Sequence, residues 1–188
     1  MSRQITRSVI GALSIVFGTI LANNINHTYL SPLTFSLGII FVIILNLGLI
    51  TRSVPSGEGF KNCGIILIVN IAVAIIAGLS LRSCGSFPTI IKPALVPAIG
   101  TGIIIGLVSV ANIKKTNYTV PVTFMLMFSF VYLKIPHCVV CAFYYGASPQ
   151  NAIENMPGLL VVIVGNIIGG LIIRYLFKIC NALSEEKE

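Results

Sequence analysis

The sequence predicts an all-α membrane protein made of one domain, residues 1–188, with six transmembrane helices in a 3+3 inverted repeat that contains two broken helices. Three observations predict this class. The chain is 56% hydrophobic and only 9% charged, whereas soluble domains carry about 25% charged residues. The chain contains six apolar segments, and their lengths are of the order of the roughly 20 residues that a membrane-spanning helix needs. The two halves of the chain also resemble each other.

The charge distribution sets the expected topology. A net charge of +7 would suggest nucleic acid for a soluble protein, but here the basic residues flank apolar segments, so no nucleic-acid partner is expected. Basic residues concentrate on the cytoplasmic side of membrane proteins. If both termini are cytoplasmic, that side collects nine basic residues: Arg3, Arg7, Arg52, Lys61, Lys114, Lys115, Arg174, Lys178 and Lys187. We expect a multi-pass protein of a bacterial inner membrane.

The six expected spans follow one another with compact connections. They cover residues 9–22, 32–50, 63–81, 94–113, 119–145 and 156–180. The first resembles a signal peptide, but no small-residue cleavage site follows it, so it is interpreted as a retained span. Breaks rich in Gly, Pro and Ser separate the second span from the third and the third from the fourth.

The fifth span carries an unusual polar group near its middle, where Lys134, Pro136 and His137 lie close together. An ionisable side chain at the centre of a bilayer costs roughly 2.5–3.5 kcal/mol. Proline removes a backbone donor and clashes with the preceding turn, so the helix should kink or break here. Backbone freed at membrane depth must be buried in protein or line a wet cavity. The pattern therefore indicates a transport pathway.

An internal repeat relates the two halves. Shifting the numbering by 89 superimposes Ile10 on Ile99, and it matches Asn, Tyr and Pro residues as well: Asn23 with Asn112, Tyr29 with Tyr118, and Pro32 with Pro121. The units cover residues 8–82 and 97–178. Each holds three spans, and an odd number inverts one copy relative to the other. The same shift pairs Gly48 with His137 and Thr51 with Val140, which predicts a second break around residues 48–53.

Taken together, these motifs resemble the formate/nitrite transporter family, whose fold is the aquaporin-like formate channel fold. Residues 165–170 read GNIIGG, like the family's last helix. His137 matches the histidine of the family's F-E-H-S-x-A-N-M motif, and Leu49 and Thr51 match the leucine and threonine of its E-L-F-T-G-N motif. Three positions depart from those motifs: Pro136 replaces a glutamate, Cys141 an asparagine, and Arg52 a glycine.

This resemblance implies a homopentamer in the lipid bilayer that passes a small monovalent anion or its neutral acid, of the formate, nitrite, lactate or hydrosulfide class. A bare anion crosses an apolar constriction at high cost, so protonation by His137, which titrates near neutral pH, would couple passage to a proton. The Thr51 hydroxyl would bond the substrate or the imidazole. The expected pathway residues are His137, Thr51, Lys134, Leu49, Cys141 and Arg52.

Several of these residues also have purely structural interpretations. Lys134 can extend to the membrane surface or pair with a carbonyl at the break, and Thr51 can cap the broken helix. A structural role at breaks and helix contacts is expected for seven residues: Gly48, Pro136, Asn70, Asn166, Gly165, Gly169 and Gly170. His137, Cys138 and Cys141 have the residue types of a metal site, but no second ligand cluster accompanies them. No metal or cofactor is expected.

Two other functional classes compete with a channel. An enzyme is not expected, because no nucleotide-binding loop, zinc-protease helix or nucleophile elbow is present and the spans hold no Asp and no mid-span Glu. The competing membrane function is the substrate-binding subunit of a vitamin-uptake transporter, which also has six spans in a short chain. Such a subunit would not show an inverted repeat.

Overall fold

The protein is described from a computed structural model, which covers residues 2–25, 27–113 and 119–185. Those residues form helices and connecting segments without a strand. Of the basic residues used above for topology, Lys114, Lys115 and Lys187 lie outside the described residues. The elements, in chain order, are α1 (Ser2–Asn24), α2 (Leu30–Ile44), α3 (Ile50–Ser53), α4 (Phe60–Leu81), the 3₁₀ turn η1 (Arg82–Cys84), α5 (Leu95–Ile113), α6 (Thr119–Tyr132), α7 (Cys138–Ala147), the 3₁₀ turn η2 (Pro149–Asn151) and α8 (Ala152–Glu185).

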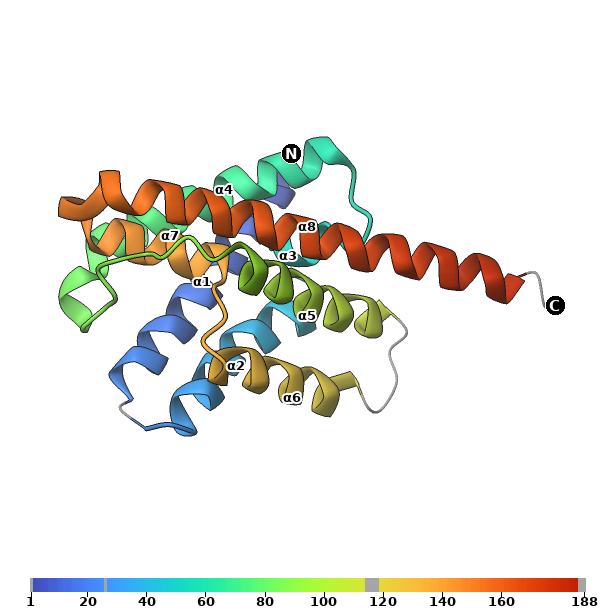
Figure 1. Ribbon diagram of the computed structural model, residues 1–188, viewed down its shortest axis with the longest axis horizontal. Helices are drawn as coiled ribbons and strands as arrows, with labels where there is room; N and C mark the ends of the chain where they lie inside the picture. The colour runs from blue at the N-terminus through green and yellow to red at the C-terminus, as the bar shows by residue number, and fades with distance from the viewer. Residues whose placement is uncertain (1, 26, 114–118, 186–188) are drawn as a thin grey trace.

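Four of the six expected spans are single helices, α1, α4, α5 and α8. Three of these, α1, α4 and α8, are long and apolar enough to cross a membrane, judged by length and composition over the described residues. The longest, α8, follows one side of the molecule, and its C-terminal end projects beyond the other helices (Figure 1). The prediction of an all-α membrane protein is confirmed at this level.

The fifth span is interrupted at the proline. Helix α6 ends at Tyr132 and α7 begins at Cys138, and residues 133–137 between them are not helical. Pro136 lies inside the interruption, as expected for a residue that cannot continue a helix. The backbone of Lys134 there has a φ of 52°, a left-handed conformation that is uncommon for a residue with a side chain.

The second span is also interrupted, but earlier than the sequence predicts. Helix α2 ends at Ile44, residues 45–49 form the break, and Ile50–Ser53 are helical again as α3. The predicted break around residues 48–53 is therefore wrong in position. No proline marks this break. It depends instead on contacts with α1 and α4, which a pattern of single residues does not show.

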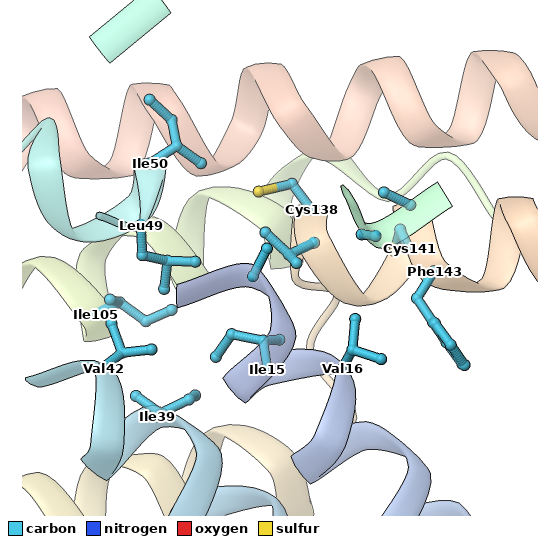
Figure 2. Close-up of a cluster of buried hydrophobic side chains, with 14 of the residues drawn as sticks. Ile15, Val16, Ile39, Val42, Leu49, Ile50, Ile105, Cys138, Cys141 and Phe143 are labelled. Atoms are coloured by element: carbon cyan, nitrogen blue, oxygen red, sulfur yellow. The ribbon is translucent and has the colours of Figure 1, made fainter. Parts of the chain in front are cut away.

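Close helix contacts hold these segments together. Helix α5 packs along α8, α4 along α7, and α1 along α2. Glycines lie where backbones approach: a Cβ at Gly165 would lie 2.6 Å from Ala98 Cβ, one at Gly170 would lie 3.1 Å from Val54 Cγ1, and one at Gly169 would collide with the Ile99 carbonyl oxygen. In the core, apolar side chains of α3 and α7 meet those of α1, α2 and α5 (Figure 2).

Candidate functional site

The two interruptions have the same backbone shape. Leu49 precedes α3 with φ −129° and ψ 130°, and His137 precedes α7 with φ −109° and ψ 132°. Three residues earlier, Asn46 and Lys134 have φ angles of 53° and 52°. Each break therefore turns the chain through one left-handed residue and returns it to helix through one extended residue.

A buried asparagine completes each break. Asn70 of α4 accepts a hydrogen bond from the Ile50 N–H (2.9 Å) and donates to the carbonyl oxygens of Ser8 (2.9 Å) and Gly48 (3.1 Å). Asn166 of α8 accepts one from the Cys138 N–H (2.9 Å) and donates to the carbonyl oxygens of Ala98 (2.9 Å) and Pro136 (3.3 Å). Both amides are fully buried. They satisfy backbone groups that a broken helix would leave without partners.

These hydrogen bonds correct the alignment of the two halves. Gly48 and Pro136 accept from equivalent amides, and Ile50 and Cys138 donate to equivalent oxygens. Both pairs differ by 88 in residue number, not 89, because α6 has 14 residues where α2 has 15. Around the breaks, Leu49 rather than Gly48 therefore corresponds to His137. Thr51 corresponds to Val139 rather than to Val140.

The two breaks meet at a buried pair of polar side chains. Thr51 Oγ1 lies 3.2 Å from His137 Nε2, and both residues are almost fully buried. His137 Nδ1 accepts a hydrogen bond from the Val139 N–H (3.2 Å), so the imidazole caps the N-terminus of α7. A nitrogen that accepts in a neutral ring carries no proton. We therefore assign the proton to Nε2, which donates to the Thr51 hydroxyl oxygen.

A large cavity reaches one member of this pair, His137, whereas Thr51 does not line it. It has a volume of about 1280 Å³, and His137, Pro136, Val140 and Cys141 lie in its wall together with Lys134. His27, Lys92 and Lys134 bring basic groups to the cavity, whose lining includes no carboxylate. Lys134, His27 and Lys92 are exposed, whereas His137 and Cys141 in the same wall are buried.

Two buried aromatic rings line this cavity. Phe35 and Phe130 both line it and are buried, and their ring centroids lie 5.9 Å apart. Phe130 also lies 6.2 Å from the His137 ring, edge to face. Neither phenylalanine is predicted from the sequence, because a hydrophobic residue in a span has no pattern that distinguishes a cavity wall from ordinary packing.

The other predicted pathway residues separate into two groups. Cys141 is buried and lines the cavity one helical turn after His137. Leu49 is completely buried beneath α3, near Ile105 and Val42 in the view of Figure 2, and does not line the cavity. Arg52 does not reach the cavity either. Its guanidinium group instead donates to the carbonyl oxygen of Leu47 (3.2 Å) and to the side chain of Asn46.

Comparison with known proteins identifies the fold. The structure is similar to a pentameric formate channel with formate bound, with a TM-score of 0.65 and 16% sequence identity over 98% of this chain and 95% of that chain. It is also similar to an FNT family ion channel, with a TM-score of 0.64 and 15% identity over 93% and 86% of the two chains. No protein-family model and no curated protein matches the sequence.

The chain thus has the fold of the formate/nitrite transporter channels. The fold that the sequence motifs indicated is confirmed. Both matched structures are channels and not enzymes, in agreement with the sequence prediction.

Proposed function

We propose that this protein is a membrane channel or transporter for a small monovalent anion or its neutral acid, of the formate, nitrite, lactate or hydrosulfide class. Each protomer of a homopentamer has its own pore, and transport is coupled to protons through His137. The matched pentameric formate channel supports both the assembly and the substrate class. The proposal includes an inner-membrane location, and the distribution of basic residues supports an orientation with both termini in the cytoplasm.

The proposal includes the 3+3 inverted repeat. The matched φ angles of Asn46 and Lys134 and the matched hydrogen bonds of Asn70 and Asn166 support it, because one folding unit used twice reproduces such details. Inverted repeats place their substrate site at the midplane, between discontinuous helices in corresponding positions. The meeting of Thr51 and His137 between the two interrupted helices supports such a site.

The hydrogen bond between Thr51 and His137 is the observation that carries the proposal. Since Nε2–H donates to the Thr51 oxygen, the Thr51 hydroxyl can donate its own proton to an anion. An imidazolium at position 137 would pass its Nε2 proton to the threonine oxygen while the threonine proton moves to the anion. The products are a neutral acid, a neutral imidazole and an unchanged hydroxyl group.

The histidine cap imposes a condition on this relay. His137 Nδ1 accepts from the Val139 N–H, and an imidazolium has no acceptor nitrogen. The ring must therefore release the Val139 N–H before it takes up a second proton. We propose that this release accompanies the arrival of an anion, whose charge stabilises the imidazolium in a low-dielectric site.

The remaining predicted residues have supporting roles in this proposal. Lys134 attracts anions to the cavity, and Cys141 contributes to its wall. Leu49, at the position equivalent to His137, belongs to the apolar constriction that a bare anion crosses at high cost. The structural residues maintain the two breaks or the helix contacts. The competing function, substrate capture for a vitamin-uptake transporter, does not explain why both breaks are built alike.

Flux measurements on the purified protein in liposomes test the proposal. We expect formate-driven swelling together with proton uptake in the wild type. His137→Phe should abolish the proton-coupled flux while the oligomer forms as before. His27→Phe is the matched control, because His27 also lines the cavity but does not contact Thr51. Unchanged coupling in His137→Phe would overturn the mechanism, and absence of wild-type flux for every anion would overturn the function.

A further inference from the structure

The first break carries a group of arginines that the sequence motifs of the fold do not explain. Arg7 of α1 donates to the backbone oxygen of Asn46, and Arg52 of α3 donates to the side-chain oxygen of the same residue. Both guanidinium groups therefore converge on Asn46, an exposed residue. Arg7, Asn46 and Arg52 are called the arginine pair site below.

The charges of this site are not balanced by a carboxylate. In the described part of the chain, the hydrogen bonds of both guanidinium groups go to Asn46 and Leu47. Glu58 lies near enough for its negative charge to attract Arg52, but its carboxylate accepts its hydrogen bond from Ser53 Oγ (3.3 Å). Two cations held beside one neutral amide repel each other. An anion between them would remove that repulsion.

One donor of the site is left without a partner. Arg52 Nε is buried, and among the described residues it is the only buried side-chain nitrogen or oxygen atom that lacks a hydrogen bond. A buried donor without a partner is destabilising, and more so when the group is charged. A water molecule or an ion can satisfy such a donor. For a guanidinium the matching partner is a planar anion with two oxygens.

In the proposed inverted repeat, this site would lie at a second mouth of the pore, opposite the large cavity. Lys134 and Val140 line the large cavity. Leu49 and His137 differ by 88 in residue number. With the same difference, Lys134 corresponds to Asn46 and Val140 to Arg52. Pro97 also lines the cavity. Pro97 directly precedes Ala98, whose carbonyl oxygen accepts a hydrogen bond from Asn166. Arg7 directly precedes Ser8, whose carbonyl oxygen accepts one from Asn70. Arg7 and Pro97 therefore hold corresponding positions.

All three members of the arginine pair site thus correspond to cavity-lining residues of the other half. Arg52 directly follows Thr51 in α3, and Thr51 contacts His137. The two mouths differ in chemistry. One presents a single exposed lysine at its break, and the other presents two anchored guanidinium groups.

We propose that Arg7, Asn46 and Arg52 form a binding site for a small planar monoanion, a carboxylate or nitrite-like ion, at the mouth opposite the large cavity. This inference rests on the proposed function for the identity of the ligand, which is the transported anion. The anion binds at this site before it reaches the Thr51 hydroxyl. The asymmetry between the mouths makes the arginine side the one that saturates at lower anion concentration.

Binding to the purified full-length protein in detergent tests the site directly. The probe is sodium formate at constant ionic strength, and the readout is the rise of the unfolding midpoint with formate concentration. We expect Arg7→Gln and Arg52→Gln each to raise the apparent Kd by about tenfold or more, the loss of a charge-assisted bond. Arg52→Lys keeps the charge without the planar fork, and it should be intermediate.

The matched control is Arg174→Gln. Arg174 belongs to α8 and lies beside Gly57, a residue of the connection that follows α3. Among the described residues, the hydrogen bonds of the arginine pair site do not involve Arg174. This variant removes the same charge from the same end of the protein, so it should bind formate as the wild type does. Equal formate affinity in the wild type and both glutamine variants would overturn the site. The glutamine variants could instead have a lower unfolding midpoint without formate, while formate raises that midpoint as much as in the wild type. That result would show that the arginines only anchor Asn46.

A second arm separates a transported anion from a lipid headgroup, which offers similar oxygen atoms. Stabilisation by phosphatidylglycerol but not by formate, lost in Arg7→Gln, would overturn the assignment to a transported anion. Flux in liposomes separates this inference from the proposed function. Wild-type formate flux with arginine-independent binding refutes only the site. Arginine-dependent binding without flux of any anion leaves the site standing and refutes the channel.

Discussion

Leu49 and His137 occupy the same place in the two interrupted helices. Each is the extended residue that precedes the second helical segment, and the next backbone N–H in each case donates to a buried asparagine of a long helix. Only one of the two side chains can titrate. The two breaks thus place an apolar side chain and an imidazole at matching backbone positions, and the proposed proton relay depends on this difference.

Removal of the Thr51 hydroxyl should slow transport without changing the fold. Thr51→Val keeps the shape of the side chain but removes the oxygen that lies 3.2 Å from His137 Nε2. We expect anion flux in liposomes to fall about tenfold, the effect of one lost hydrogen bond of about 1.4 kcal/mol in the transport barrier. Thr19→Val is the matched control, because Thr19 also lines the cavity but donates to Ile15 of its own helix (2.8 Å). Equal flux in both variants would contradict the role of Thr51.

Asn166 should be essential for the stability of the second break. Asn166→Ala leaves the Cys138 N–H and the carbonyl oxygens of Ala98 and Pro136 without their partners. Since each buried polar group left unsatisfied costs about 1–3 kcal/mol, the free energy of unfolding should fall by at least about 2 kcal/mol. Thermal unfolding in detergent measures this change. Asn151→Ala removes one exposed hydrogen bond to Thr89 and should lower the unfolding midpoint far less. A similar loss in both variants would contradict the role of Asn166 in stabilising the second break.

A methyl group at Gly48 should disrupt the contact between the first break and α1. A Cβ there would lie 2.6 Å from Ser8 Oγ and 3.2 Å from the Ser8 backbone. Gly48→Ala should therefore destabilise the protein by about 1–3 kcal/mol, as overpacking does. Gly64 lies in a helix with no neighbouring atom within 4 Å of the added Cβ. Gly64→Ala should stabilise by about 0.5–1 kcal/mol, and the same sign for both variants in unfolding experiments would contradict this contact.

The charge of Lys134 should assist access of anions to the cavity. Lys134→Asn removes the charge but suits the left-handed backbone, since Asn46 has nearly the same φ. We expect the half-saturating anion concentration to rise severalfold, and the effect should shrink at high ionic strength because salt screens exposed charges. Lys134→Arg should behave as the wild type. A half-saturating concentration that is insensitive to both charge and salt would show that Lys134 has no part in anion attraction.

Much of this architecture could be predicted from local sequence properties. Apolar length identified the helices, and Pro136 identified the second interruption because its ring cannot continue a helix. Asn70 and Asn166 were selected because buried amides in spans need partners. The first interruption was placed several residues late, and the alignment of the halves was wrong by one residue around the breaks. A difference of one residue between α2 and α6 leaves no trace in hydrophobicity.

The sequence by itself determined that this chain enters a membrane as helices and that one helix breaks at a histidine, because hydrophobic length and proline chemistry act locally. Only the tertiary structure decided which side chains meet. The Thr51 and His137 pair joins residues 86 positions apart, and the arginine pair site joins α1 to the first break. Such contacts depend on how helices pack against one another, and packing is a property of the assembled chain.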